Sequence, residues 1–422
     1  MKHLVTLVAG SLMLAGTALA QDLAVINGRV ITNTAQGQIE SGGVLIRDGL
    51  VVEVGANITV PDGATTIDAD GGWITPGIFA AYSQLGLIEV ALEDSSNDAA
   101  AAESHFSAAL DVSDSYNPNG SYLATTRIEG ITRFAVFPST GQNLFAGQGA
   151  LGHTGGGMDS LFATQSFVFA DLSQSGAATA GGSRAAAWAF LEAAFGDARA
   201  YPGRFAGGEG DALNRYDAAA LVGVVRGRIP LILEIDRASD IRRAIRFAAE
   251  NAPVQLVIYG AAEAWMVAEE LAAARIPVLM DPIGNLPVSF DALGTTLESA
   301  SRLNEAGVTV AYTTQTADGY FNARLLPQHA GNAVTNGVPW ADAFRAITLT
   351  PAEIYGVGDQ YGALAAGFAA DVVVWDGDPL EVMSAPTHVI VDGALTDLES
   401  RQTRLRDRYA DIEDTMPFGY RH

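Results

Sequence analysis

The central part of the chain repeats short apolar runs followed by longer stretches in which apolar residues recur every three or four positions. The apolar runs fit buried strands, and the periodic stretches fit amphipathic helices. Strands are predicted at Ile74–Gln84, Ile131–Pro138, Gly149–His153, Ser166–Leu172, Ile229–Asp236, Val254–Gly260, Ile276–Pro282 and Val308–Thr314. Helices are predicted at Ser183–Arg199, Asp211–Arg228, Ser239–Glu250, Glu263–Arg275 and Asp291–Glu305. This alternation predicts an α/β fold, a (β/α)8 barrel with its functional residues at the C-terminal ends of the strands.

Both ends of the chain show a different pattern, one of short strands separated by Asn-Gly and Asp-Gly turns. The predicted strand segments are Ala24–Thr32, Gly42–Gly55, Ala64–Gly71, Ala370–Leu380 and Pro386–Thr396. Because these two blocks flank the alternating region, they predict one small β domain built from both ends. The expected domains are residues 21–75 with 362–400 for this β domain, 76–361 for the barrel, and 401–422 for a charged C-terminal tail.

The first residues have the form of an export signal. Lys2 and His3 precede a run of apolar and small residues, and Ala18-Leu19-Ala20 has the small-x-small form of a cleavage site. The apolar run is shorter than the ~20 residues that cross a bilayer. The sequence therefore predicts a signal peptide over residues 1–20 and an exported, periplasmic protein without a membrane span.

Composition narrows the chemistry. The formal net charge of −24 disfavours binding to nucleic acid, whose phosphates would be repelled. The chain has no cysteine, which excludes disulfides and thiolate catalysis. Lys2 is the only lysine and lies in the predicted signal peptide, so the mature chain has no lysine for a Schiff base.

Two segments carry a family resemblance. Trp73–Val90 reads WITPGIFAAYSQLGLIEV and resembles the first barrel strand of the amidohydrolase superfamily, in which a Pro-Gly and an Asp precede a metal-binding His-x-His pair. Here the pair reads Tyr82-Ser83-Gln84, and Ala80 stands where the Asp usually is. Gly307–Leu380, ending in Gly-Asp-Pro-Leu, is similar to the imidazolonepropionase-related members. The resemblance implies a barrel inserted in a β-sandwich that both chain ends build.

The resemblance also implies where metal ligands would lie, namely on strands 1, 4, 5, 6 and 8. The positions that can be matched hold Tyr82, Gln84, Glu234, Tyr259 and Gln315. Zn²⁺ takes His, Cys, Asp or Glu, so only Glu234 suits the ion that the resemblance would imply. No lysine is available to bridge two metals. We therefore expect neither a bound metal nor another cofactor.

The replacements at these positions are all polar. They predict either a pocket for a small-molecule ligand or a network of side chains that bond one another and close the cavity. Glu234 is the candidate catalytic residue, because a carboxyl group beside Tyr82 and Tyr259 is expected to have a raised pKa and to suit a general base. Asp236 lies two residues along the same strand and shares its face.

These features leave three hypotheses and leave open whether the protein is an enzyme. The first is an exported amidohydrolase-superfamily protein that has lost its metal site and acts as a ligand-binding or regulatory subunit, as a homo-oligomer or with an intact relative. The second is a hydrolase of C–N bonds in cyclic amides or small peptides, with non-standard ligands or with Glu234 as general base. The third is a structural scaffold whose pocket has collapsed.

Overall fold

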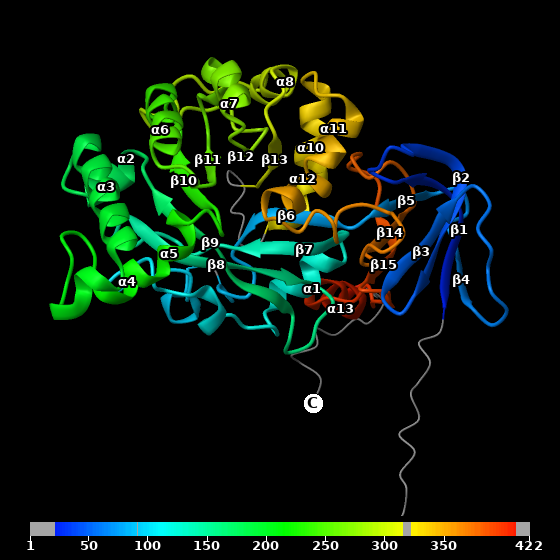
Figure 1. Cartoon of the computed structure of the whole chain (residues 1–422). Helices are drawn as coiled ribbons and strands as arrows, with labels where there is room; N and C mark the ends of the chain where they lie inside the picture. Colours follow the sequence, from blue (N-terminus) through cyan, green and yellow to red (C-terminus); the bar gives the residue numbers. More distant parts are fainter. Residues whose placement is uncertain (1–21, 91, 315–321, 411–422) are drawn as a thin grey trace, which may run out of the picture.

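The computed structural model describes residues 22–90, 92–314 and 322–410, so the predicted signal peptide and Gln315 lie outside the described residues. Two eight-stranded sheets organise the chain (Figure 1). This mixed α/β arrangement confirms the coarse prediction of a barrel sheet with a second sheet. Among the described residues, no helix has the length and apolar character needed to cross a bilayer.

The first sheet forms a nearly closed barrel in which strand order follows the sequence and the last strand, β13, lies beside the first, β6. Its strands are β6 (Ile78–Ser83), β7 (Ile131–Val136), β8 (Phe145–His153), β9 (Leu161–Asp171), β10 (Leu231–Ile235), β11 (Leu256–Gly260), β12 (Val278–Met280) and β13 (Val310–Tyr312). Each overlaps a predicted strand. Only the first predicted strand is divided, because it turns at Gly77 from the second sheet into the barrel.

Gly77 explains that division. A Cβ atom at this position would lie 2.1 Å from Thr132 Oγ1, so only glycine allows the two chain segments to approach so closely. The residues before it form β5 of the second sheet, and those after it form β6 of the barrel.

The barrel departs from the predicted (β/α)8 pattern at its third strand. β8 pairs antiparallel with both β7 and β9, whereas the other neighbours are parallel. The connections, residues 137–144 and 154–160, are shorter than the dozen or more residues that a parallel crossover needs, and no helix forms in either. The expectation of eight strand–helix units was therefore wrong for β7 to β9, which form hairpins.

The second sheet has the order β16-β15-β14-β5-β1-β2-β3, with β4 paired to β1. Its strands are β1 (Leu23–Ile31), β2 (Gln38–Arg47), β3 (Leu50–Gly55), β4 (Thr65–Asp68), β5 (Trp73–Pro76), β14 (Val372–Trp375), β15 (Pro386–Val391) and β16 (Ala394–Leu395). It thus draws strands from both ends of the chain, and β5 joins β14 in antiparallel register.

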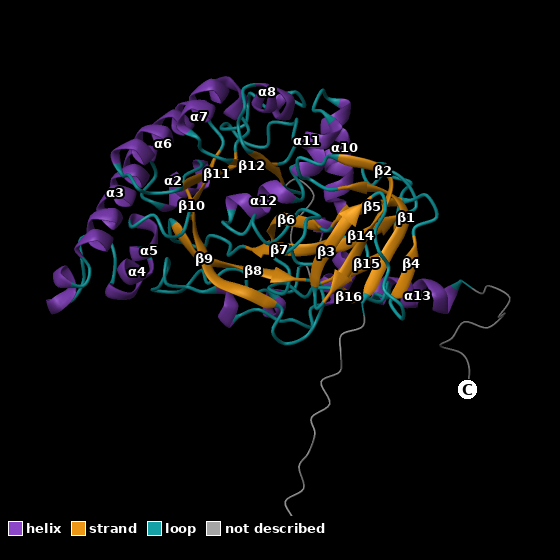
Figure 2. Cartoon of the chain, turned by 45° about the vertical axis from the view of Figure 1, so that its right-hand side comes forward, coloured by secondary structure: helices purple, strands orange, loops and turns teal. Residues whose placement is uncertain are grey.

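Helices cover the outer face of the barrel, and Figure 2 shows α3, α6, α7 and α8 as an arc outside β9 to β12. The helices of the described residues are α1 (Ser121–Arg127), α2 (Gln174–Thr179), α3 (Arg184–Ala200), α4 (Arg215–Ala220), α5 (Val222–Val225), α6 (Ala238–Glu250), α7 (Ala268–Ala274), α8 (Ser299–Glu305), α10 (Leu326–Thr335), α11 (Trp340–Arg345), α12 (Leu349–Ile354) and α13 (Arg401–Tyr409). Short 3-10 turns are η1 (Asp94–Ser96), η2 (Val112–Asp114), η3 (Gly203–Gly207), η4 (Ala264–Val267) and η6 (Ala323–Leu325).

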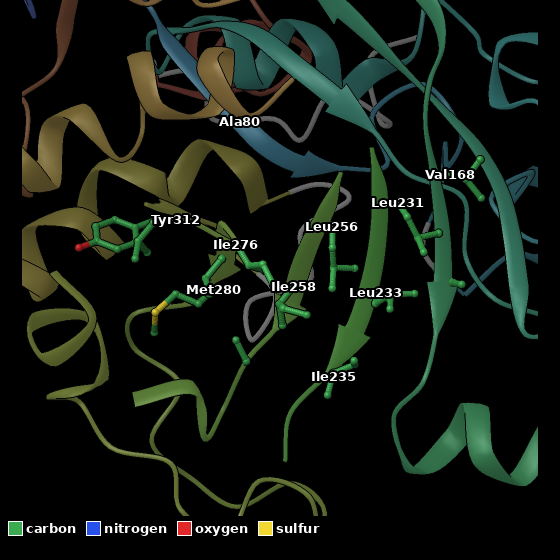
Figure 3. Close-up of a cluster of buried hydrophobic side chains, with 14 of the residues drawn as sticks. Ala80, Val168, Leu231, Leu233, Ile235, Leu256, Ile258, Ile276, Met280 and Tyr312 are labelled. Carbon is green, nitrogen blue, oxygen red and sulfur yellow. The ribbon is translucent and has the colours of Figure 1, made fainter. Parts of the chain in front are cut away.

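Side-chain alternation along the strands separates an outer core from the barrel interior. Leu231, Leu233 and Ile235 of β10 join the outer cluster that packs against the helices (Figure 3). Ile232, between them, belongs to the inner cluster. Because successive residues of a strand point to opposite faces, Glu234 is on the same side as Ile232 and faces the barrel interior.

Candidate functional site

The candidate site lies at the C-terminal ends of β6, β9, β10 and β11. Glu234 is the register partner of Asp171 on β9 and of Tyr259 on β11, so the three residues form one row across neighbouring strands. Tyr259 belongs to the inner cluster, and Tyr82 of β6 packs against that cluster from across the barrel. The structure therefore brings together three of the predicted residues, Tyr82, Glu234 and Tyr259, and adds Asp171.

The two tyrosines form a stacked pair. The ring centroids of Tyr82 and Tyr259 are 4.8 Å apart and the rings are 18° from parallel. Phe137 packs beneath them, with its centroid 4.8 Å from that of Tyr82. Burial raises the pKa of Tyr82 to about 12, although a hydrogen bond with Tyr259 opposes the shift, and burial raises the pKa of Tyr259 well above its usual value. Both phenols are therefore protonated at neutral pH.

Glu234 is the most strongly perturbed carboxyl group in this site. Burial raises its pKa to about 8, and the negative charges of Asp171 and Asp236 add to the shift. Within the described ranges, its side chain makes no hydrogen bond or ion pair. At neutral pH, Glu234 is therefore mostly a neutral carboxylic acid that can both donate and accept a hydrogen bond.

The neighbouring aspartates differ from Glu234 because both are held by local hydrogen bonds. Asp171 is buried and accepts bonds from the Ser173 backbone N–H, at 2.7 Å, and from the Ser175 hydroxyl. Asp236 accepts a bond from the backbone N–H of Ala262 at 3.2 Å, yet burial still raises its pKa to about 6. These bonds fix the two carboxylates in place and leave Glu234 as the free group between them.

The remaining predicted positions contribute differently. Gln84 is buried, and its amide donates a hydrogen bond to the Ser139 hydroxyl, which orients this side chain toward the segment after β7. Gln315 lies outside the described residues.

These residues do not fit a catalytic zinc or a similar ion. Such sites need three or more imidazole, thiolate or carboxylate ligands around one ion. In residues 22–90, 92–314 and 322–410, no group of three or more His, Asp or Glu side chains is placed to hold a metal. The donors at the matched positions are two neutral phenols, an amide and one carboxyl group, so no chemical step is assigned here to a metal.

One polar pair near the barrel mouth was not predicted. His329 of α10 and Asp281, which directly follows β12, are both buried and lie 2.9 Å apart between Nδ1 and Oδ1. The sequence shows only two isolated residues, 48 positions apart, with no ligand-like spacing. The contact depends on how α10 packs over the end of β12, which no local pattern encodes.

Known proteins resemble this chain in fold and in part of its sequence. Residues 240–401 match the profile of the Amidohydrolase family, so the chain carries an amidohydrolase family domain there. A crystal structure of an amidohydrolase from Thermotoga maritima has a TM-score of 0.80 at 24% identity and covers 89% of this chain and 99% of that one. At this identity the likeness shows the fold alone.

Two curated relatives match shorter stretches. The amidohydrolase tasK of Hapsidospora irregularis is 29% identical over 178 residues, which are 41% of this chain and 18% of that protein. The imidazolonepropionase of Mesorhizobium japonicum is 40% identical over 53 residues, 12% of this chain and 13% of that protein. The chain therefore spans less than a fifth of the length of either relative, and their activities are not carried over to it.

Proposed function

We propose that this protein is an exported, metal-free member of the amidohydrolase superfamily that binds a small molecule at the barrel mouth and acts as a binding or regulatory subunit. The observation that carries the proposal is the stacked, hydrogen-bonded pair of Tyr82 and Tyr259. Two aromatic rings occupy strand ends where the superfamily would hold metal-binding imidazoles. Their packing on Phe137 supports a site built for another purpose.

Glu234 favours a ligand pocket over a collapsed scaffold. A closed hydrogen-bond network would satisfy this carboxyl group, because an unpaired buried polar group costs about 1–3 kcal/mol. Instead, Glu234 has no partner in the described part of the chain, and its side chain is partly exposed. A ligand with a hydrogen-bonding group would complete the interaction.

A C–N hydrolase is the second candidate, and the raised pKa of Glu234 favours it. As a general base, the Glu234 carboxylate would take a proton from a water molecule as the water oxygen bonds to a carbonyl carbon and the C=O π electrons move to the carbonyl oxygen. The protonated Glu234 would then give that proton to the amide nitrogen as the C=O re-forms and the C–N bond breaks, which releases an amine and a carboxylic acid. The reaction would then need the ionised form, so its rate would rise with pH up to about 8. This candidate predicts a pH–rate profile that Glu234→Gln abolishes.

Metal analysis tests the proposal. The purified full-length protein would be soaked in zinc or manganese, desalted, and examined by elemental analysis. We expect much less than one metal ion per chain, and stoichiometric retention would overturn the proposal. Candidate cyclic amides and dipeptides would then be screened by thermal shift, with Glu234→Gln expected to lose the shift.

Glu381→Gln is the matched control for that screen. Glu381 is exposed and far along the chain from the site, and its side chain makes no ion pair among the described residues. This variant should keep the full ligand-induced shift. Equal losses in the two variants would mean that the effect is not local to the barrel mouth.

A further inference from the structure

A cavity outside the barrel mouth has the features of a second binding site. It has a volume of about 330 Å³, and it is lined mainly by the segment that follows β6 and by Tyr216 of α4. Figure 1 shows α4 at the lower left. This volume is within the range of small-molecule sites. Its apolar lining includes Phe106, Leu110, Val112, Pro138 and Tyr216. We call it the side cavity.

Hydrogen bonds fix the wall of the side cavity. Asp217 of α4 is buried and accepts bonds from the backbone N–H groups of Ser107, at 2.9 Å, and Ala109, at 2.8 Å. Asn214, just before α4, donates a bond to the carbonyl oxygen of His105 at 3.2 Å. The segment on each side of Phe106 is therefore tied to α4, so a ligand would meet a wall that is already formed.

Two aromatic rings stand exposed at the side cavity. Phe106 is 44% exposed and Tyr216 is 66% exposed, and their rings meet edge to face with centroids 5.6 Å apart. A second hollow of about 610 Å³ lies on the other side of Ala109 and Tyr216, which line both. Paired exposed aromatics beside a cavity are typical of a surface that a ligand covers.

The charges around the side cavity are all negative. Asp98, Asp111 and Asp114 line it, and no arginine or histidine lines it in the described part of the chain. The Asp98 and Asp114 side chains make no hydrogen bond or ion pair within the described ranges, whereas Asp111 accepts bonds from Ser113. Three carboxylates at an apolar cavity, in a chain of net charge −24, would attract a cation and repel an anion.

We propose that the side cavity binds a small organic ammonium ion with an aromatic or alkyl body. The body fills the apolar cavity against Phe106 and Tyr216, and the ammonium group lies toward Asp98 and Asp114. The aromatic faces add a cation–π attraction to the charge interaction. This site is separate from Glu234 and does not depend on the function of the barrel mouth.

Isothermal titration calorimetry with three probes of similar shape tests the ligand class. The full-length protein would be titrated at neutral pH with phenethylamine, 2-phenylethanol and phenylacetate. Saturable binding is expected for phenethylamine, with weaker binding of the neutral alcohol and none of the anion. Equal binding of amine and alcohol would overturn the proposal, as would no detectable binding of the amine.

Variants locate the site. Asp98→Asn and Asp114→Asn should each weaken phenethylamine binding about fivefold, the effect of removing one charge interaction near water. Tyr216→Ala should weaken it further by removing an aromatic wall. Asp62→Asn, which removes an exposed acid in the turn before β4, is the matched control and should bind as the parent does. All these side chains are exposed, and equal melting temperatures would verify that each variant folds.

Two outcomes would assign the binding elsewhere. Equal weakening by Asp62→Asn would show attraction to overall charge rather than to the side cavity. Loss of binding in Glu234→Gln, with Asp98→Asn unchanged, would place the amine at the barrel mouth. Either result would overturn the proposal.

Discussion

At the scale of single residues, the chemistry depends on the environment of Glu234. Its pKa in the folded chain is raised from 4.5 to about 8. Between these values the folded protein keeps a proton that the unfolded chain releases, so the group lowers the free energy of unfolding as pH rises through this window. Below pH 4.5 the carboxyl group is protonated in both states and has no such effect.

Glu234→Gln should therefore stabilise the protein in a pH-dependent way. We expect little change in the free energy of unfolding near pH 4.5 and a gain on the order of 3 kcal/mol at pH 8, since glutamine carries no charge to desolvate. Urea denaturation at a series of pH values measures this difference. A gain of the same size at every pH would contradict the assigned cause, and Glu381→Gln should give none.

The sequence indicated which residues lie at the barrel mouth, but not which of them contact one another. The frame of Trp73–Val90 located Tyr82, and the family resemblance, applied to the ends of the predicted strands, located Glu234 and Tyr259. Strand register then determined that Asp171 lies beside Glu234, and side-chain packing determined that the two tyrosines stack. Both depend on residues far apart in sequence, so no local pattern encodes them.

At the scale of elements, the strands were predicted better than their directions. Apolar runs identified each barrel strand, because burial on both faces requires them. β8 is antiparallel because the connections on either side of it are too short for a parallel crossover. The prediction of a (β/α)8 barrel did not take the lengths of these connections into account. The predicted helix Asp291–Glu305 was too long, because only Ser299–Glu305 is helical.

Residues 291–298, which were predicted to be helical, belong instead to a loop that an ion pair and a hydrogen bond hold in place. Arg184 at the start of α3 pairs with Asp240, at 2.7 Å, and with buried Asp291. Glu263 accepts a bond from the backbone N–H of Gly294 at 3.2 Å. These contacts tie the loop 283–298 over the strand ends, and helical geometry there would break them.

Arg184→Ala should therefore loosen this loop. Losing the arginine leaves Asp291 buried without its partner, at a cost of about 1–3 kcal/mol. We expect a lower melting temperature and faster hydrogen exchange over residues 283–298. Arg406→Ala, on exposed α13, is the control and should change neither. Unchanged exchange in the loop with a lowered melting temperature would show that Arg184 stabilises another region.

At the scale of the whole molecule, export stays a prediction that the N-terminal sequence makes. If residues 1–20 are a signal peptide, the protein secreted by a bacterial host should begin at Gln21. Edman sequencing or intact mass of the periplasmic fraction would measure this. Ala18→Arg and Ala20→Arg together should block cleavage, and a product that still begins at Met1 without these changes would contradict the prediction.

The two sheets are joined by a buried arginine. Arg133 of β7, in the barrel, donates two hydrogen bonds, at 2.6 and 3.0 Å, to the carboxylate of Asp371, which directly precedes β14 of the second sheet. It also donates a hydrogen bond to Asp392. Arg133 and Asp371 are only 2% and 4% exposed. The Arg133 guanidinium also stacks on Tyr361, 4.2 Å from the ring centroid. Because both charged groups are buried away from water, each is stabilised mainly by its contact with the other.

Breaking this pair should cost more than removing it. Arg133→Met alone leaves Asp371 as an unpaired buried charge, and we expect a loss of about 3–5 kcal/mol in the free energy of unfolding. Arg133→Met with Asp371→Leu removes both charges and should recover part of that loss, because apolar side chains can fill the same space. Urea denaturation measures both variants, with Arg29→Met of the exposed Arg29–Glu40 pair as a control expected to change little. A double variant at least as unstable as Arg133→Met alone would contradict this prediction, because removing the second charge would then recover none of the loss.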